Sequence, residues 1–351
     1  MTGTRMANLG KIVAIDLFCG VGGLTYGLEK AGIHVAAGID VDPACQFPYE
    51  ANTSGKFILS DIATVTVEAM NKLFGDAEVR LLAGCAPCQP FSSHSKGRDT
   101  SKDPKWPLLD HFARLIQGTN PHLVTMENVV RIQGHAVFSR FVRKLQTAGY
   151  EVVWGSLYCP DYGIPQERRR LVLMASRIGG VELPKPSHTP EKYVTVRKAI
   201  GDLPKLAAGQ ADRLDRLHAA RNLTPINIAR LQHSVPGGTW LDWPRALRSP
   251  CHTRKTGSSF KSVYGRMAWD LPAPTITTQY NNFGTGRFGH PTQDRALSLR
   301  EGAILQSFPP DYQFCSSEKL VVHSTVARLI GNAVPPRLGQ VVGKAFKLSM
   351  M

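Results

Sequence analysis

The chain has 351 residues, 42% hydrophobic and 20% charged, which is the composition of a folded globular protein and excludes a disordered one. No apolar run approaches the ~20 residues of a membrane-spanning helix, and the first residues lack the apolar core of a secretory signal. Lys and Arg exceed Asp and Glu by 42 − 27 = +15, an unusual excess for an enzyme of small metabolites. We therefore expect an intracellular protein of two domains that binds a polyanion.

The positive charge is concentrated in one part of the chain. Residues 186–300 hold 17 Lys and Arg against 7 Asp and Glu, a net charge of +10. This concentration is typical of a nucleic-acid-binding surface, although a solvated basic face would have the same composition. The seven cysteines are odd in number and scattered, which favours reduced thiols over a disulfide framework.

Short apolar runs alternate with amphipathic stretches from Lys11 to about Ser176. Buried strands are predicted at residues 12–18, 35–40, 56–59, 79–84, 122–127, 150–157 and 170–175. Helices are predicted at residues 24–31, after the Asp42-Pro43 cap, at 108–117 and at 136–148. Strands that alternate with helices indicate an α/β fold with a doubly wound, mainly parallel sheet.

The pattern changes after Arg177. Residues 180–292 are rich in proline and glycine and show little sustained periodicity, which predicts an irregular second domain of short elements and loops. Regular patterns return at residues 298–305 and from Ser324 to the C-terminus.

The first three strands are followed by residues suited to a nucleotide-like ligand. A glycine-rich turn at residues 16–24 lets a ligand approach a helix N-terminus, although its spacing is not G-x-G-x-x-G. Asp40 and Asp61 follow the second and third strands, where acidic side chains bind ribose or adenine. Because no P-loop lysine accompanies them, the pattern favours an adenosine ligand without phosphate. Either aspartate could instead be a turn or cap residue.

A cysteine between two prolines follows the fourth strand. Pro87 and Pro90 restrict the backbone around Cys88, which places this thiol on a stiff loop at the carboxyl end of a strand. Glu127 ends the fifth strand at the same edge, where a carboxyl beside a nucleophilic thiol serves in proton transfer. A structural cysteine in a tight turn is the alternative.

Two further patterns lie near this cysteine. Arg168 and Arg170 share one face of an extended segment and suit an anionic or carbonyl-rich substrate, or plain solvation. Cys85 and Cys88 form a C-x-x-C pair, but no second ligand pair supports zinc, and the order of elements does not fit a thioredoxin-like redox site. We therefore expect no metal.

These motifs occur in one order, and in that order the chain resembles the C5-cytosine-specific DNA methyltransferase family nearly end to end. The motifs are D-L-F-C-G-V-G-G-L at 16–24, P-C-Q-P-F-S at 87–92, E-N-V at 127–129, Q-E-R-R-R at 166–170, R-E at 300–301, Q-S-F-P at 306–309 and G-N-A-V-P-P at 331–336. The resemblance implies a Rossmann-like catalytic and cofactor-binding domain at residues 1–185, completed by 320–351. It implies a smaller target-recognition domain at residues 186–319.

The implied reaction is methyl transfer from S-adenosyl-L-methionine to C5 of a cytosine flipped out of a specific duplex DNA sequence. Cys88 would attack C6, Glu127 would donate to N3, Arg170 would hold O2, and Arg168 would support it. The residues implied to bind the cofactor are Phe18, Val21, Gly22, Gly23, Asp40, Val41, Asp61, Ile62, Pro87, Leu108, Asn332 and Ala333. The residues implied to contact DNA are Gln89, Ser92, Arg254, Lys255, Ser258, Ser259, Lys261, Arg266, Thr277, Gln279, Tyr280, Asn281 and Arg287.

This chain departs from the family pattern at three positions. Family members often carry Glu at the position of Asp40, an aromatic or larger apolar residue at that of Val41, and Gly or Pro at that of Cys85.

The resemblance also implies partners and leaves rivals open. It implies double-stranded DNA as the partner and no association with a membrane. It also implies a monomeric enzyme of a prokaryote or phage that lies in the cytoplasm and reaches the nucleoid by binding DNA. A restriction endonuclease encoded with it is the implied genetic partner. One rival is a tRNA cytosine methyltransferase, whose branch usually has Thr at the position of Ser92. A second rival is a catalytically silent DNA-binding module, which the intact set of catalytic residues disfavours. A third is a nicotinamide oxidoreductase, which the absence of a G-x-G-x-x-G motif disfavours.

Overall fold

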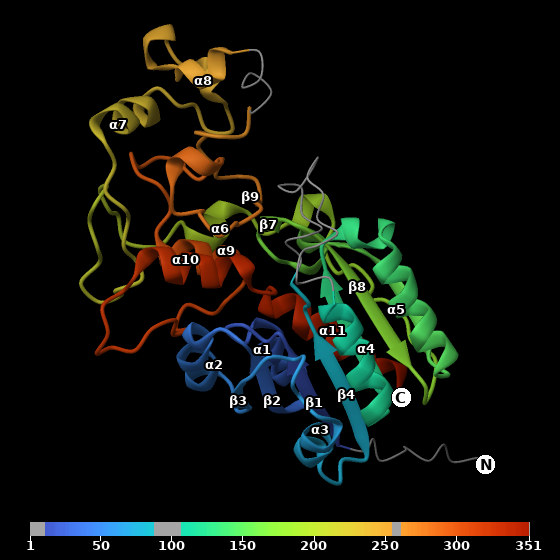
Figure 1. The fold of residues 1–351 in the computed structure, drawn as a ribbon. Coiled ribbons are helices and arrows are strands. Elements are labelled where there is room, and N and C mark those ends of the chain that lie inside the picture. The colour runs from blue at the N-terminus through green and yellow to red at the C-terminus, as the bar shows by residue number, and fades with distance from the viewer. Residues whose placement is uncertain (1–10, 88–106, 255–260, 351) are drawn as a thin grey trace, which may run out of the picture. The chain divides into compact units, whose positions relative to one another are not determined.

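The computed structural model describes residues 11–87, 107–254 and 261–350, and the chain divides into two compact units (Figure 1). The first unit comprises Met1–Tyr158, Arg169–Ser187 and Val334–Met351, and the second comprises Cys159–Arg168 and His188–Ala333. Residues 159–168 and 320–333, which the sequence analysis assigned to the first domain, thus belong to the second unit. The target-recognition role of this second unit stays a prediction.

A seven-stranded sheet is the centre of the first unit. Its strand order is β3-β2-β1-β4-β5-β8-β6, formed by β1 (Ile12–Leu17), β2 (His34–Asp40), β3 (Lys56–Leu59), β4 (Val79–Gly84), β5 (Leu123–Asn128), β6 (Glu151–Tyr158) and β8 (Arg169–Ser176). The first five strands pair in parallel, and β8 is antiparallel to both β5 and β6. The predicted α/β class with a mainly parallel sheet is confirmed. The parallel strands end at one edge, where such sheets carry ligand sites.

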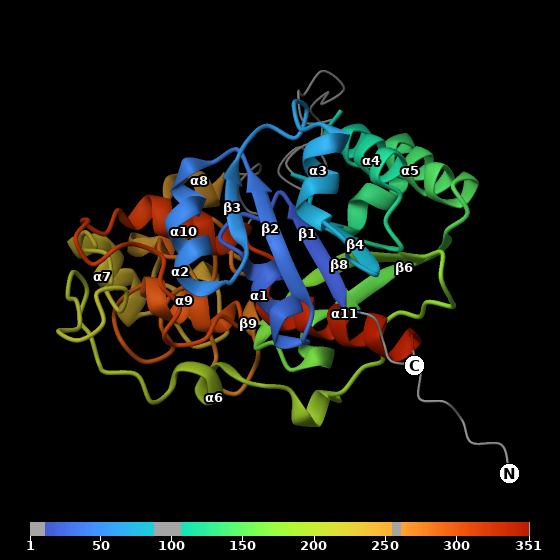
Figure 2. The ribbon, with the colours of Figure 1, turned by 90° about the horizontal axis from the view of Figure 1, so that it is seen from below.

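Helices cover both faces of this sheet. α3 (Val67–Phe74), α4 (Leu108–Thr119) and α5 (Ala136–Thr147) lie on one face, while α1 (Gly23–Lys30) and α11 (Pro336–Ser349) lie on the other (Figure 2). Apolar side chains of β1, β4, β5 and β8 form one buried core with α3, α4 and α5. The predicted cap before α2 (Gln46–Asn52) is confirmed, since the Asp42 side chain accepts from the Ala44 N–H at 3.0 Å and Pro43 begins a 3₁₀ turn.

The contact between α1 and α11 depends on glycine. A Cβ built at Gly27 would lie 2.2 Å from the Pro336 carbonyl oxygen, and one at Gly339 would lie 2.9 Å from that of Leu24. The two helix backbones therefore touch, and this contact joins the end of the chain to the first unit.

The second unit is irregular, as the sequence predicts. Its described elements include the parallel pair β7 (Gln166–Glu167) and β9 (Ala273–Pro274), and the helices α6 (Val196–Ile200), α7 (Pro225–Gln232), α8 (Pro250–Thr253), α9 (Leu299–Leu305) and α10 (His323–Asn332). Aromatic side chains supply a small core here, in which Trp240, Trp243 and Phe283 pack with Leu231 and Ala296.

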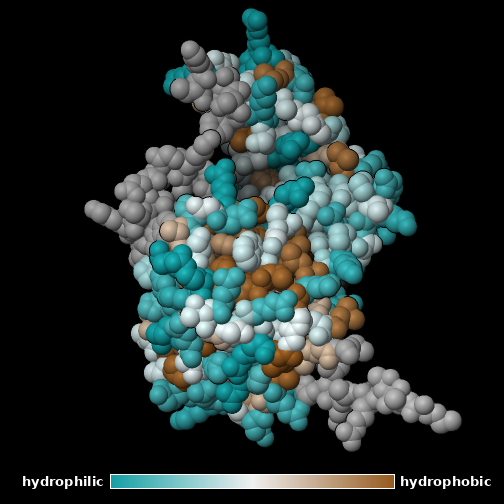
Figure 3. Space-filling model, turned by 90° about the vertical axis from the view of Figure 1, so that its right-hand side faces the viewer, coloured by the Kyte–Doolittle hydropathy of each residue, from teal (hydrophilic) through white to brown (hydrophobic). Residues whose placement is uncertain are grey.

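None of the helices in the described part of the chain has the length and apolarity to cross a bilayer. The face shown in Figure 3 is mainly hydrophilic or intermediate, with hydrophobic side chains between. Such a mixture is usual on folded proteins.

Candidate active site

A buried carboxylate, a guanidinium and a thiol meet at the carboxyl edge of the sheet. The register that places Gly84 beside Met126 brings Cys85 next to Glu127, and the pairing of Glu127 with Val172 brings Arg170 to the same point. Arg170 Nε lies 2.8 Å from Glu127 Oε1, and Cys85 Sγ donates to Glu127 Oε2 at 2.8 Å. The predicted proximity of Glu127 and Arg170 is thus present in the structure, while the Cys85 contact was not predicted.

The two oxygens of Glu127 differ in their hydrogen bonding. Oε2 accepts from the thiol of Cys85. Oε1 is buried and forms an ion pair with Arg170, but it accepts no hydrogen bond from any described residue. The arrangement therefore favours a ligand that brings a hydrogen-bonding edge to Glu127.

The backbone just before Cys88 is held from both sides. The Cys85 N–H donates to the Leu17 carbonyl at 3.2 Å, and the side chain of Asn128 donates to the Ala86 carbonyl at 3.0 Å. Asn128 is almost fully buried. The E-N-V motif thus supplies both a carboxylate and a tether for the loop, and sequence reasoning missed the tether. Cys88, Gln89 and Ser92 lie outside the described residues, so their roles stay predictions.

The glycine-rich turn after β1 is locked to β2 by a carboxylate. The Gly20 N–H donates to Asp40 Oδ2 and the Asp42 N–H donates to Oδ1, both at 2.9 Å. Phe18 has a φ of 58°, an uncommon conformation for a side chain other than glycine and a frequent mark of ligand sites. Burial raises the pKa of Asp40, against the lowering effect of these backbone bonds.

A second carboxyl group, that of Asp16, is buried next to this turn. Asp16 is fully buried, and Thr25 Oγ1 donates to its Oδ2 at 2.8 Å while lying 3.3 Å from the Tyr49 hydroxyl. Burial raises the pKa of Asp16 to about 7, an effect that the Thr25 bond opposes and the charge of Asp40 reinforces. The sequence pattern predicts Asp16 only as part of the turn.

The other residues predicted to bind the cofactor vary in exposure. The Val41 side chain is 67% exposed beside the partly buried Asp40, as an apolar contact for a ligand would be. Asp61 is exposed and accepts from the Ala63 N–H at 2.9 Å. Val21, Gly22, Gly23 and Ile62 are buried, Pro87 and Leu108 are half-buried, and Asn332 and Ala333 belong to the second unit.

This edge fits S-adenosylmethionine. It offers a strained glycine turn, a clamped carboxylate and an exposed apolar side chain at the ends of adjacent parallel strands. Within the described residues, His, Cys, Asp and Glu form no group of three or more that could hold a metal ion.

A glutamine joins three family motifs inside the second unit. Gln306 accepts from Gln166 Nε2 at 2.6 Å and donates to the carbonyls of Ile330 and Ala333 at 2.8 and 3.3 Å. The buried Arg168 donates to the Ile276 carbonyl at 3.1 Å. Arg168 thus belongs to the second unit while Arg170 belongs to the first, and the supporting role of Arg168 stays a prediction.

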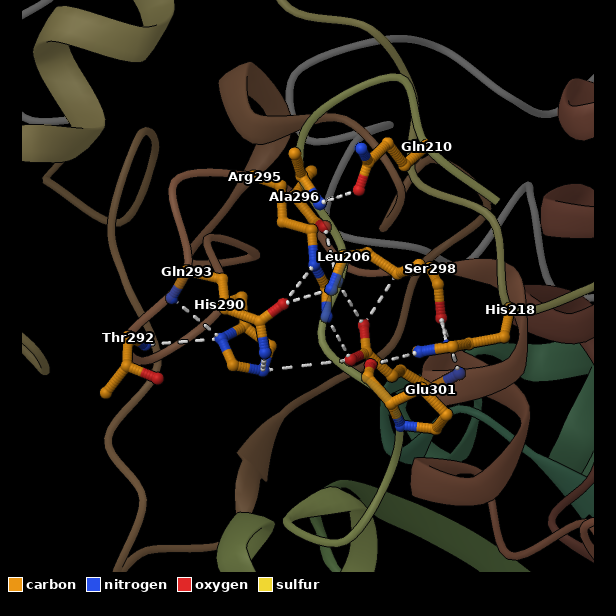
Figure 4. A network of polar contacts seen from close by, with 12 residues as sticks. Leu206, Gln210, His218, His290, Thr292, Gln293, Arg295, Ala296, Ser298 and Glu301 are labelled. Atoms are coloured by element: carbon orange, nitrogen blue, oxygen red, sulfur yellow. Dashed lines mark hydrogen bonds and ion pairs between the residues drawn. The ribbon is translucent and has the colours of Figure 1, made fainter. Parts of the chain in front are cut away.

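Glu301 of the R-E motif lies in a buried polar network (Figure 4). Arg295 donates to both oxygens of Glu301 at 2.7 Å, and Glu301 also accepts from the Ser298 N–H to close a capping box on α9. Burial opposes ionisation of Glu301, but Arg295 outweighs it and lowers the pKa of Glu301. Arg300 pairs separately with Asp215 at 2.5 Å. These contacts join α9 to the loops that precede it in the second unit.

The predicted DNA contacts divide by burial. Tyr280 is fully buried with its hydroxyl donating to the Leu299 carbonyl, and Arg266 is buried against carbonyls of Leu231, His290 and Gln293. Both side chains therefore pack inside the second unit and are not exposed to a DNA surface. Asn281 is also buried. Arg254, Lys261 and Gln279 are exposed and Thr277 and Arg287 half-buried, whereas Lys255, Ser258 and Ser259 lie outside the described residues.

Comparison with known proteins places the chain among DNA-modifying enzymes. A family model for C-5 cytosine-specific DNA methylases matches residues 12–348. The chain is 50% identical over 336 residues to the Type II methylase M.HgiDII of Herpetosiphon aurantiacus, covering 95% of this chain and 94% of that protein. It is 34% identical over 337 residues to the Type II methyltransferase M1.HphI of Haemophilus parahaemolyticus, covering 94% and 85%.

Solved structures share the fold at lower identity. A prophage-encoded E. coli protein described as a DNA modification methyltransferase superposes with a TM-score of 0.72 at 20% identity, covering 96% of this chain and 99% of that one. The Entamoeba histolytica methyltransferase EhMeth gives 0.65 at 15% identity, covering 96% and 98%.

Proposed function

Because the chain belongs to the C-5 cytosine-specific DNA methylase family, we propose that it methylates C5 of a flipped cytosine in a specific duplex DNA sequence through a covalent Cys88–C6 adduct. S-Adenosyl-L-methionine supplies the methyl group, carried on its sulfonium sulfur. The residues of the chain make cytosine C5 reactive and hold the base in place.

The chemistry begins at C6 of the cytosine. The Cys88 thiolate forms a bond to C6 while Glu127 donates a proton to N3. The C5–C6 electrons then become those of an enamine, and C5 takes the methyl group, whose bond to the sulfonium sulfur breaks with its electron pair left on sulfur. A base removes the C5 proton, and the electron pair of that C–H bond forms the C5–C6 double bond and expels Cys88 as thiolate. N3 returns its proton to Glu127, which restores the neutral ring. Such an addition turns a poor carbon nucleophile into a good one.

Arg170 stabilises the charge that develops during addition. Its guanidinium has five N–H donors, so it can keep the ion pair with Glu127 and also donate to cytosine O2. The observation that most supports this proposal concerns Glu127 Oε1. This oxygen is buried and accepts no hydrogen bond from the described residues, so it is suited to the polar edge of a base.

The cofactor contacts follow from the turn after β1. Asp40 is proposed to serve the ribose, Val41 and Ile62 the adenine faces, and Asp61 the adenine amino group. Phe18, Val21, Gly22, Gly23, Pro87, Leu108, Asn332 and Ala333 complete the proposed set. The Asp40 carboxylate also accepts a hydrogen bond from the Gly20 N–H. The same side chain would therefore hold the glycine-rich turn and bind the ribose.

The relatives favour DNA over tRNA as substrate. Two of them, covering most of both chains, are named Type II methylase and methyltransferase. We propose accordingly a monomeric, cytoplasmic modification enzyme that meets the nucleoid through DNA and is encoded with a restriction endonuclease.

Bisulfite sequencing tests the substrate and the nucleophile together. Plasmid DNA and tRNA from cells that express the protein should be compared with those from cells expressing Cys88→Ala or the matched control Cys315→Ala, a half-buried thiol of the second unit. We expect one methylated DNA sequence with wild type and Cys315→Ala and none with Cys88→Ala. Methylation by Cys88→Ala would overturn the covalent mechanism. Methylation confined to tRNA would overturn the assignment of duplex DNA as the substrate.

A further inference from the structure

The thiol of Cys85 lies against the proposed proton donor and not in a separate pocket. Cys85 follows β4 directly, and its backbone is fixed by the bond from its N–H to the Leu17 carbonyl. Its side chain is half-buried and donates to Glu127 Oε2 at 2.8 Å. The contact therefore joins two residues whose backbones are both held by the parallel sheet.

This contact fixes one end of a carboxylate whose other end already has a partner. Arg170 Nε lies beside Oε1, and the thiol lies beside Oε2, so rotation of the carboxylate about its last bond would cost both contacts. The thiol must keep its proton to donate, because a thiolate would repel the neighbouring carboxylate. Glycine or proline, which family members often carry here, offers no such donor.

We propose that Cys85 is a positioning residue for Glu127, whose S–H holds Oε2 so that Oε1 stays turned toward the base. This inference rests on the proposed function, because it assumes that Glu127 acts on cytosine. The S–H acts through Glu127, which the proposed mechanism uses in the chemical step. The effect should therefore appear in the chemical step and leave binding of the substrates unchanged.

Removal and replacement of the donor separate positioning from space filling. Cys85→Ala and Cys85→Gly remove the S–H, whereas Cys85→Ser keeps a donor of similar size. We expect kcat to fall about tenfold in Cys85→Ala and Cys85→Gly, with the KM for DNA and for S-adenosylmethionine within about twofold of wild type. Cys85→Ser should restore kcat to within about threefold, and Cys315→Ala should match wild type throughout.

A double-mutant cycle shows whether Cys85 acts through Glu127. Exchange of the cytosine C5 hydrogen with solvent should be followed without methyl transfer, because it reports addition at C6 alone. In a Glu127→Gln background, Cys85→Ala should have no further effect on this exchange, whereas with Glu127 intact it should slow exchange about tenfold. Urea unfolding of each variant checks that it is folded.

Each outcome decides the proposal. A wild-type kcat in folded Cys85→Ala and Cys85→Gly overturns it, as does a Cys85→Ser variant as slow as Cys85→Ala. An equal effect of Cys85→Ala with and without Glu127 also overturns it. If Cys88→Ala and Glu127→Gln are inactive while Cys85→Ala is unaffected, the positioning role alone fails. If Cys88→Ala is active, the proposed function fails first.

Discussion

Two buried carboxyls of the first unit differ in the partners that surround them. Glu127 lies beside a guanidinium, whereas Asp16 has the neutral hydroxyl of Thr25 on one oxygen and no hydrogen bond from the described residues on the other. Ionisation of Asp16 therefore costs free energy that the hydrogen bond from Thr25 offsets only in part. The protein should bind a proton at Asp16 more tightly when folded than when unfolded.

The stability of the protein should accordingly fall as Asp16 ionises. The pKa of Asp16 is about 7 in the folded protein against an ordinary value of 3.8, so the contribution of neutral Asp16 to the free energy of unfolding is fully present below the ordinary value. This contribution declines by about 1.4 kcal/mol for each pH unit between the two values and levels off above the folded pKa. Asp16→Asn cannot lose a proton, so urea unfolding should show its stability relative to wild type rising between about pH 4 and about pH 7 and constant above that. The exposed Asp202→Asn serves as control. Parallel curves for wild type and Asp16→Asn would contradict this prediction.

Sequence reasoning identified individual residues better than their contacts. The strand-end position of Glu127 and its proximity to Arg170 could be predicted, because strand ends in a parallel sheet share one edge. The contact of Cys85 could not, because it depends on the register of Gly84 with Met126, which no local pattern specifies.

At the scale of elements, the crossing of α1 and α11 should tolerate no side chain. Gly27→Ala adds a Cβ 2.2 Å from the Pro336 carbonyl oxygen and 2.6 Å from the Gln340 nitrogen, both of them backbone atoms that cannot move aside alone. We expect a loss of about 1–3 kcal/mol in the free energy of unfolding, measured in urea. In an isolated helix alanine would stabilise by about 1 kcal/mol relative to glycine. A decrease in the free energy of unfolding would therefore show that the close contact with α11 outweighs helix propensity.

A matched glycine provides the control for this contact. A Cβ at Gly134 would meet nothing within 4 Å, so Gly134→Ala should change stability by no more than about 0.5 kcal/mol. Equal stability of the two variants would show that the helices can separate without cost.

Elements of the first unit were predictable to within a few residues, and those of the second were not. Short continuous apolar runs predict β1, β4 and β5, because these strands are buried on both faces. In the second unit, Tyr280 and Arg266 have the residue types of DNA contacts, yet tertiary packing buries both. Without periodicity, residue type does not tell which side chain faces inward.

For the whole molecule, net charge predicts a polyanion partner but not which residues meet it. Within residues 188–333, Arg197 pairs with Asp270, Arg266 with Asp294, Arg295 with Glu301 and Arg300 with Asp215. These arginines add to the count of basic residues while serving the fold. Exposed cations outside such pairs, among them Arg254 and Lys261, are better placed to neutralise phosphates.

Salt dependence can count those phosphate contacts. Each neutralised phosphate contributes about −0.9 to the slope of log K against log salt concentration for duplex DNA. A double variant, Arg254→Ala with Lys261→Ala, should therefore reduce the steepness by about 2 in binding titrations at several salt concentrations. Lys344→Ala, which removes an exposed cation from α11 in the first unit, should leave the slope unchanged. If the double variant kept the wild-type slope, these loop cations would lie away from the DNA, and the excess charge of the second unit would act only as a long-range field.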